Sequence, residues 1–187
     1  MERRQVCAVR GIRSLAVAVS VALAPHLVVV APGGAPARAQ AATPLSAVDR
    51  QFLLQAGNMG NSQPALAGLA ARRAADPRVR RYARQLLADH ARIEELLRRV
   101  ARAIGATLPG RLDEPATRER SRLLRLSGSA FDREFLRFEV LDFRFHVEQF
   151  TREVAQGATP ALRRFAREVR PTIEQHLRTA LSLAATR

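Results

Sequence analysis

The sequence lacks several groups on which catalysis and metal binding commonly depend. Its only cysteine, Cys7, lies near the N-terminus, so the rest of the chain can form no disulfide, catalytic thiolate or thiolate metal site. No Gly-x-Ser-x-Gly nucleophile motif occurs, and Ser127 and Ser129 are better explained as helix-start residues. Glu-x-x-His is also missing, although ferritin-like di-iron bundles take that pair from each of two helices. We therefore expect no catalytic residues and no complete di-iron site.

Lysine is absent too, because all 31 basic residues are arginine against 17 acidic residues, which leaves a formal net charge of +14. Codon bias in a GC-rich genome explains the arginine content more simply than function does. A balance this basic permits contact with an anionic envelope surface or another protein. Nucleic acid is disfavoured as a partner, because the arginines are spread over the outer faces of the predicted helices without interleaved aromatics or a nucleic-acid motif.

The N-terminus has the pattern of an export signal. Four arginines precede an apolar run over 15–24, which continues over 27–31 after Pro25 and His26. Ala37-Arg38-Ala39 is a small-x-small cleavage site, with residues 39–41 as a second choice. We predict a signal peptide over 1–39, a linker over 40–45 and a periplasmic or secreted mature chain without a transmembrane helix. An uncleaved membrane anchor is disfavoured because proline and histidine interrupt the apolar run.

An internal repeat predicts the fold. Asp76–Leu86 aligns with Thr159–Val169 at a separation of 83 residues, matching two prolines, two pairs of arginines and Tyr82 with Phe165. A long helical pattern precedes each copy, so the repeat indicates a duplicated helical hairpin. We predict an all-α, up-down four-helix bundle over residues 46–184.

The start and stop signals place five helical segments. The first runs from Ser46 to about residue 75, with a kink or break expected near Pro64. The second runs from Pro77 to Gly105, and a short piece covers 115–126. The third long helix is expected to be capped by Ser129 and to end at Gly157, and the fourth to begin at residue 160 and bend at Pro171.

Six ionisable side chains are candidates for a site inside the bundle. The third long helix is apolar over more than half of its circumference, with Phe138, Phe143 and Phe150 expected to be buried and Phe145 on a neighbouring apolar arc. The candidates fall on or between the apolar stripes of three helices: His90, Glu94, Glu139, Asp142, His146 and His176. Gln63 occupies the inner stripe of the first helix, where a metal ligand would be wanted.

Two hypotheses explain these inward groups. Acids and histidines at a bundle core usually form a hydrogen-bonded network, because a buried charge must be paired. On this hypothesis the protein binds no cofactor and has a structural or interaction role. The alternative is a site for iron, manganese or zinc, since oxygen ligands with imidazoles suit these ions. Asp89 and His90 cannot form a catalytic dyad, because adjacent helical residues point about 100° apart.

Several motifs resemble a known family. Leu86-Leu87-Ala88-Asp89-His90, the segment Ser127–Arg133, and Pro171 with His176-Leu177 are similar to the domain of unknown function 4142 family. The resemblance covers roughly 49–183 and implies a ferritin-like bundle in a secreted or outer membrane protein, without an established activity. The chain departs from the family's acidic pair at Gln63-Pro64-Ala65, and has Asp142-Phe143 where the family has Asp-His.

The export signal gives the first testable prediction. Because cleavage after Ala39 or Ala41 is expected, intact-mass measurement on the exported protein should give an N-terminus at Gln40 or Ala42. Recovery of a membrane-bound chain that starts at Met1 would contradict it.

Overall fold

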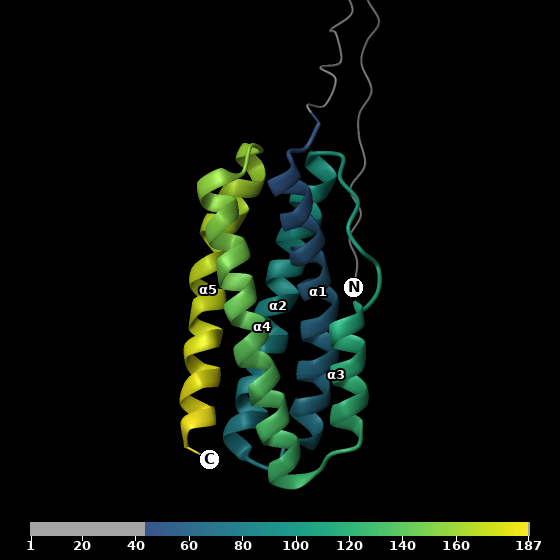
Figure 1. The fold of residues 1–187 in the computed structure, drawn as a ribbon, viewed down its shortest axis with the longest axis vertical. Helices are drawn as coiled ribbons and strands as arrows, with labels where there is room; N and C mark the ends of the chain where they lie inside the picture. The colour runs from purple at the N-terminus through teal and green to yellow at the C-terminus, as the bar shows by residue number, and fades with distance from the viewer. Residues whose placement is uncertain (1–43, 187) are drawn as a thin grey trace, which may run out of the picture. The chain divides into compact units, whose positions relative to one another are not determined.

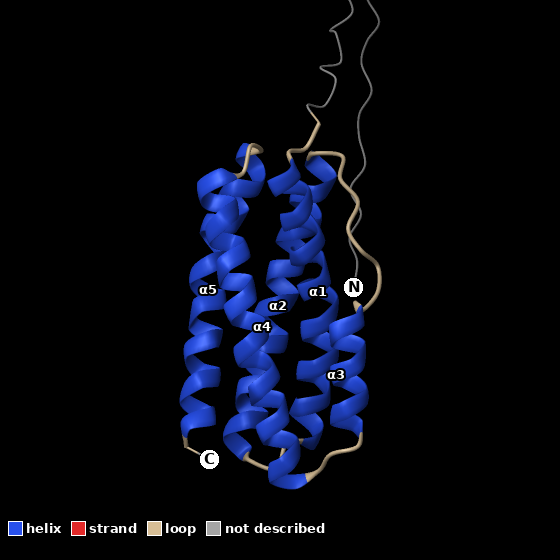
Figure 2. Cartoon of the chain, viewed as in Figure 1, coloured by secondary structure: helices blue, strands red, loops and turns tan. Residues whose placement is uncertain are grey.

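The computed structural model describes residues 44–186, which form five α-helices and no strand (Figures 1 and 2). These residues belong to a compact unit that spans 40–187. The predicted signal peptide at 1–39, Cys7 and most of the predicted linker lie outside the described residues. None of the five helices contains an apolar stretch long enough to cross a membrane.

Four long helices pack side by side around a common core, and a short fifth helix lies on their outside. α1 contacts α2 and α4, and α5 contacts the same two helices, so the four long helices follow the order α1, α2, α5, α4 around the core. The short helix α3 packs against α1 and α4 (Figure 1). The helix bounds are α1 Ala47–Arg73, α2 Pro77–Ala103, α3 Glu114–Leu124, α4 Gly128–Gln156 and α5 Pro160–Ala185.

The chain forms two antiparallel hairpins, α1–α2 and α4–α5, as the repeat predicted. The connection between the hairpins contains α3 and returns along the side of the bundle, so α2 and α4 run in the same direction (Figure 1). The up-down order therefore holds within each hairpin and not between them. A short α2–α4 turn would have produced strict alternation, and the long crossover prevents it.

Local signals explain most helix boundaries. Ser46 and Asp49 form a capping box at the start of α1, with hydrogen bonds of 3.0 and 3.1 Å. Asp76 caps α2 by accepting a hydrogen bond from the Arg78 amide at 2.6 Å. The prediction that Ser129 caps α4 was wrong, since Ser127 is the N-cap residue. Gly128 follows it with a φ of 57°, which permits the earlier start.

A kink or a break was expected near Pro64, and the break was wrong, because α1 continues through this residue. Residues 57–64, whose glycines and proline disfavour a helix, include the positions where α1 contacts the connection between α2 and α3. A Cβ atom on Gly57 would lie 2.4 Å from the Pro109 ring, so only glycine lets the connection approach this closely. Asn61 donates hydrogen bonds to the Pro109 and Arg111 carbonyl oxygens, at 2.8 and 3.2 Å. Each of these hydrogen bonds contributes about 0.5–1.5 kcal/mol, against a cost of about 3 kcal/mol for an interior proline. The α5 helix likewise continues through Pro171.

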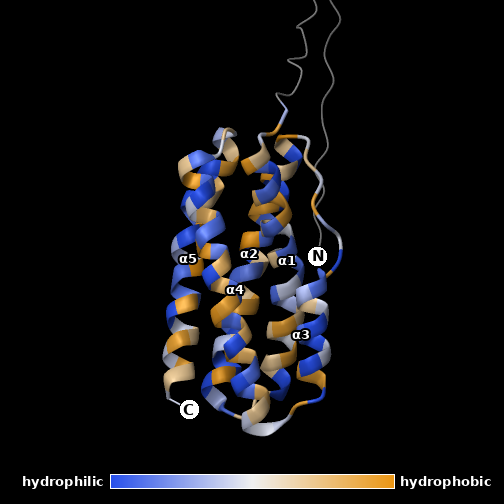
Figure 3. Ribbon diagram, in the orientation of Figure 1, coloured by the Kyte–Doolittle hydropathy of each residue, from blue (hydrophilic) through white to orange (hydrophobic). Residues whose placement is uncertain are grey.

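The core is rich in phenylalanine, and hydrophobic and hydrophilic residues alternate along each long helix (Figure 3). Phe143 and Phe150 are fully buried, as predicted, and Phe150 lies edge-on to Phe52 with ring centroids 5.0 Å apart. Phe138 is only partly buried and Phe145 is 40% exposed, so the predicted apolar arc is wider than the buried face. The neighbouring helices cover only part of α4 at these two positions.

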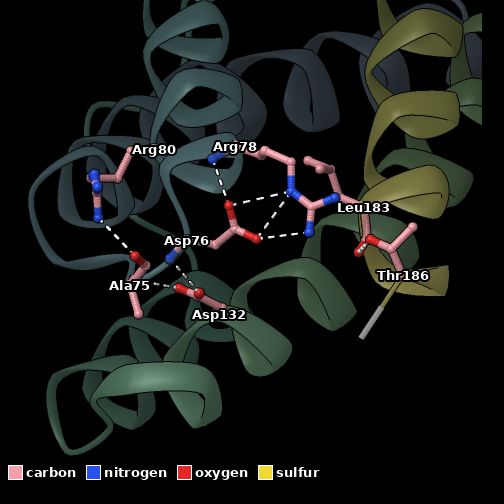
Figure 4. Close-up of polar contacts among 7 residues, drawn as sticks. All are labelled: Ala75, Asp76, Arg78, Arg80, Asp132, Leu183 and Thr186. Carbon is pink, nitrogen blue, oxygen red and sulfur yellow. Dashed lines mark hydrogen bonds and ion pairs between the residues drawn. The ribbon is translucent and has the colours of Figure 1, made fainter.

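Two buried aspartates connect the hairpins to each other. Asp49, in the first turn of α1, accepts hydrogen bonds from the Ala158 and Thr159 amides between α4 and α5, at 3.0 and 3.2 Å. Asp132, near the start of α4, accepts hydrogen bonds from the Ala75 and Asp76 amides between α1 and α2, both at 2.9 Å (Figure 4). Both aspartates are completely buried.

These contacts extend the internal repeat. Asp49 and Asp132 are 83 residues apart, as are the turns that they bind. Equivalent residues of the two hairpins therefore bind the opposite hairpin. The repeat seen in the sequence covered only α2 and α5, and did not include these two aspartates.

A third buried acid lies beside one of these contacts. Glu153 in α4 has no exposed surface, and neither of its carboxylate oxygens has a hydrogen-bond partner among the described residues. A Cβ atom on Gly157 would lie 2.1 Å from Glu153 Oε1, so glycine is needed to accommodate this side chain. Burial, together with the neighbouring Asp49 charge, raises the pKa of Glu153 to about 7, although Arg163 opposes the shift.

The raised pKa of Glu153 predicts a loss of stability with pH. Its usual pKa is 4.5, so between pH 4.5 and about 7 the folded protein binds more protons than the unfolded chain. The free energy of unfolding should therefore fall across this window and level off above it. Replacing Glu153 with Gln should flatten the fall and stabilise the protein at pH 8 by about 3 kcal/mol.

Chemical denaturation between pH 4.5 and 8 measures this effect. The matched control is Glu148→Gln, an exposed acid on the same helix, which should keep the wild-type pH profile. Equal pH profiles for Glu153→Gln and the wild type would contradict the assignment.

Candidate functional site

A hydrogen-bonded group of side chains lies at the centre of the bundle between α1 and α4. Gln63 of α1 donates from Nε2 to Glu139 Oε2 at 3.1 Å and to Asp142 Oδ2 at 3.0 Å. Asp142 also faces His146, one turn further along α4, with 3.5 Å between Oδ1 and Nε2. The helical spacing of positions 139, 142 and 146 places all three side chains on one side of α4. We call these four residues the α1–α4 polar group.

The two carboxyl groups have opposite tendencies to ionise. Burial raises the pKa of Glu139 well above its usual value, and the nearby Asp142 charge raises it further. Burial also opposes ionisation of Asp142, but the charge of His146 and hydrogen bonds from His146 and Gln63 outweigh it and lower the pKa of Asp142. This arrangement favours ionisation of Asp142 over ionisation of Glu139.

His90 of α2 lies in the core in an aromatic environment. Its ring stacks on Phe143 and on His176, with centroids 6.0 and 5.6 Å away. Neither ring nitrogen has a hydrogen-bond partner among the described residues. Burial, with the charges of His176 and His146, lowers the pKa of His90 to about 3, although Asp142 opposes this. His90 is therefore a neutral ring at neutral pH.

His176 of α5 connects the core to the opposite side of the bundle. Its Nε2 lies 3.5 Å from Asp89 Oδ2 on α2, and its backbone carbonyl accepts a 3.1 Å hydrogen bond from the Tyr82 hydroxyl. Burial lowers the pKa of His176, and the Asp89 charge opposes the shift. Asp89 also accepts a hydrogen bond from Gln85 at 2.8 Å.

The polar side chains reach the surface on two sides. A pocket of about 610 Å³ between α1, α4 and the start of α3 is lined by Asp142 and His146. A second pocket, of about 540 Å³, lies between α2 and α5 and is lined by Asp89 and His176. His90 and Phe143 lie between these two His–Asp pairs in the stacked arrangement. The site can therefore exchange protons or accept polar groups at either end, while its middle is aromatic.

The structure brings together five of the six residues proposed from the sequence: His90, Glu139, Asp142, His146 and His176 are buried or nearly so around one core. Glu94 does not join them, because it pairs with Arg98 on the surface of α2. The expected network is also incomplete, since His90 makes ring contacts and, within residues 44–186, no side-chain hydrogen bond. Sequence reasoning missed Asp89 and Tyr82 as partners of His176, although Asp89 stands in the recognised motif.

The positions of the candidate ligands do not form a complete metal site. Within residues 44–186, no group of three or more histidine, cysteine, aspartate or glutamate side chains is arranged to hold a metal ion. The two His–Asp pairs, at 3.5 Å each, are the nearest approach to such a group, and each provides two ligands. A tightly held ion needs four or more ligands, so further groups would have to move in.

Comparison with known proteins places this all-α bundle in a family. Residues 34–183 match the family described as Domain of unknown function (DUF4142). The match covers most of the chain, and the protein belongs to this family, as its motifs predicted. No curated protein and no solved structure matches the chain.

The environment of His90 predicts that its ring stabilises the protein by packing and not through hydrogen bonds of its nitrogen atoms. Because both nitrogens lack partners, His90→Phe should change the free energy of unfolding by less than about 1.5 kcal/mol. His90→Ala should cost about 2–5 kcal/mol through the cavity that it leaves. Chemical denaturation of the two variants measures both effects. A phenylalanine variant as unstable as the alanine variant would show that the nitrogens make a needed polar contact.

Proposed function

We propose that this protein is an exported, ferritin-like four-helix bundle of the cell envelope that acts as a structural or interaction domain without a catalytic centre. Two features support this proposal. The single long crossover between two antiparallel hairpins is the connectivity of ferritin-like bundles. The arginine-rich start, apolar run and small-x-small site of the sequence have the order of an export signal.

The observation that carries the non-catalytic role is the position of Gln63. In a metal-dependent ferritin-like bundle, carboxylates from different helices converge on a cation. In this chain, the Gln63 amide nitrogen lies between the Glu139 and Asp142 carboxyl groups, 3.1 and 3.0 Å away, and donates to both. The Gln63 amide thus lies between the two carboxyl groups, where a metal-dependent bundle would hold a cation. One oxygen atom of each carboxyl group accepts a hydrogen bond from this amide. An uncharged donor needs no metal to hold the two acids together.

The burial of the site also supports this role. Glu139 and Gln63 have no exposed surface, and His90 is 1% exposed. A substrate that reached these groups would have to displace phenylalanine side chains from the core, which costs several kcal/mol for each side chain. Binding a partner on the outer faces of the helices does not require this displacement and therefore costs less free energy.

The alternative function is the binding of iron, manganese or zinc. It is favoured by the two His–Asp pairs, each beside a pocket and each with a nitrogen-to-oxygen distance of 3.5 Å. Asp142 with His146, or Asp89 with His176, would supply the first two ligands. Water or a bound molecule would have to complete the coordination.

A substitution at Gln63 tests the two hypotheses. We expect the melting temperature of the wild type to be unchanged by added iron, manganese or zinc. Gln63→Glu should lower the melting temperature in the absence of metal, because it places a third acid beside Glu139 and Asp142. Manganese or zinc should then restore stability, by about 2.7 kcal/mol at a hundred times Kd.

Gln51→Glu is the matched control, since Gln51 is exposed on the same helix, and it should respond to no metal. Metal analysis of protein purified from its native compartment supplements the melting curves. A wild-type melting temperature that rises with metal, and stops rising in Asp142→Asn, would overturn the proposal in favour of the metal protein.

A further inference from the structure

An open apolar groove lies between α4 and the last turns of α5. Figure 1 shows that α4 begins and α5 ends at the same end of the bundle. It has a volume of about 740 Å³, within the range of about 300–1,000 Å³ typical of small-molecule sites. Its walls are formed by Leu136, Val140 and Leu141 of α4, with Leu181 of α5 opposite them. Leu141 is 53% exposed and Leu181 is 38% exposed, so two large apolar side chains on different helices face solvent along one groove.

The groove has a charged rim on the α4 side. Glu134 accepts hydrogen bonds from Arg137 at 2.7 and 3.0 Å and from Arg122 at 3.2 Å, and Arg137 also approaches Glu119 at 3.6 Å. These two acids and two arginines neutralise each other.

Arg133 also lines the groove, and it differs from Arg122 and Arg137 in its contacts. It donates one 3.1 Å hydrogen bond to the Ser129 hydroxyl, and among the described residues it has no ion pair with a carboxylate. A guanidinium group has five N–H donors in a planar fork that matches a carboxylate. Most of the donors of Arg133 are therefore available beside the apolar walls, and the rim carries a net positive charge.

We propose that this groove binds a single-chain fatty carboxylate, with its alkyl chain along Leu141 and Leu181 and its carboxylate on Arg133. The apolar walls gain from removing the alkyl chain from water, at roughly 25 cal/mol per Å² of buried apolar surface. The free guanidinium group selects an anionic head, because a charge-assisted pair is stronger than a neutral hydrogen bond. The proposal is independent of the role of the polar core, which lies elsewhere in the bundle.

Isothermal titration calorimetry with dodecanoate, below its micelle concentration, tests the site on the mature chain. Dodecanoate should bind at one site, while dodecyl maltoside and dodecyltrimethylammonium, which carry the same chain, should bind at least about tenfold more weakly. Dodecyl phosphate serves as a second anionic head, and we expect it to bind more weakly than dodecanoate. Equal binding of the neutral or cationic amphiphile, or tighter binding of dodecyl phosphate, would overturn the assignment to a carboxylate.

Two variants and two matched controls locate the site. Leu141→Gln and Arg133→Gln should each weaken dodecanoate binding by about tenfold or more, and circular dichroism checks that both fold. Leu124→Gln changes an equally exposed leucine outside the groove, and Arg144→Gln an exposed arginine on α4 outside it, so both should bind like the wild type. Unchanged binding in Leu141→Gln would overturn the proposal. A ligand-free dimer in sedimentation, dispersed by Leu141→Gln, would overturn it in favour of a second copy of the chain.

Discussion

The reciprocal binding of backbone amides by Asp49 and Asp132 is the interaction on which the arrangement of this bundle depends. Each carboxylate lies near the start of one hairpin and accepts hydrogen bonds from backbone amides in the connection between the two helices of the other hairpin. Helix packing alone leaves two hairpins free to slide and rotate against each other by small amounts. Hydrogen bonds to a charged acceptor, worth about 1.5–3 kcal/mol each, fix the ends of the hairpins in one register. This register also determines which side chains of the two hairpins contact each other between the ends.

The polar core follows from this register. Gln63 meets Glu139 and Asp142 because α1 and α4 are antiparallel and aligned by Asp49 at one end and Asp132 at the other. Buried acids in a phenylalanine-rich interior are costly unless they are paired or neutral. Asp142 is paired with His146, which lowers the pKa of Asp142, whereas burial raises the pKa of Glu139 and disfavours its charged form. The histidines of α2 and α5 then stack as neutral rings across the remaining space.

The outer surface has a different character from the core. Arginines pair with glutamates one turn away, as at Arg99 with Glu95 and Arg118 with Glu114, and such exposed pairs contribute at most a few tenths of a kcal/mol. The excess of arginine therefore acts through solubility and attraction of anions more than through stability. Arg133, beside the apolar groove, has no ion pair with a carboxylate within residues 44–186, and it is the place where we propose that an anion binds.

The sequence by itself determined the helices, the hairpins and the family. Proline and glycine signals at 77, 105, 157 and 160 mark helix ends because they act locally on backbone geometry. The 83-residue repeat predicted two hairpins because similar helices bury similar faces, and the apolar periodicity correctly turned His90, Glu139, Asp142 and His146 inward.

The tertiary structure decided what lies opposite each residue. Helical periodicity specifies a face and carries no information about the helix packed against it, so neither the Gln63 contacts nor the pairing of His176 with Asp89 could be obtained from the sequence. Local propensity was wrong at Gly57 and Pro64, because contacts with the crossover connection outweigh it. The direction of α4 relative to α2 also depended on that connection, whose path is set by packing over its whole length.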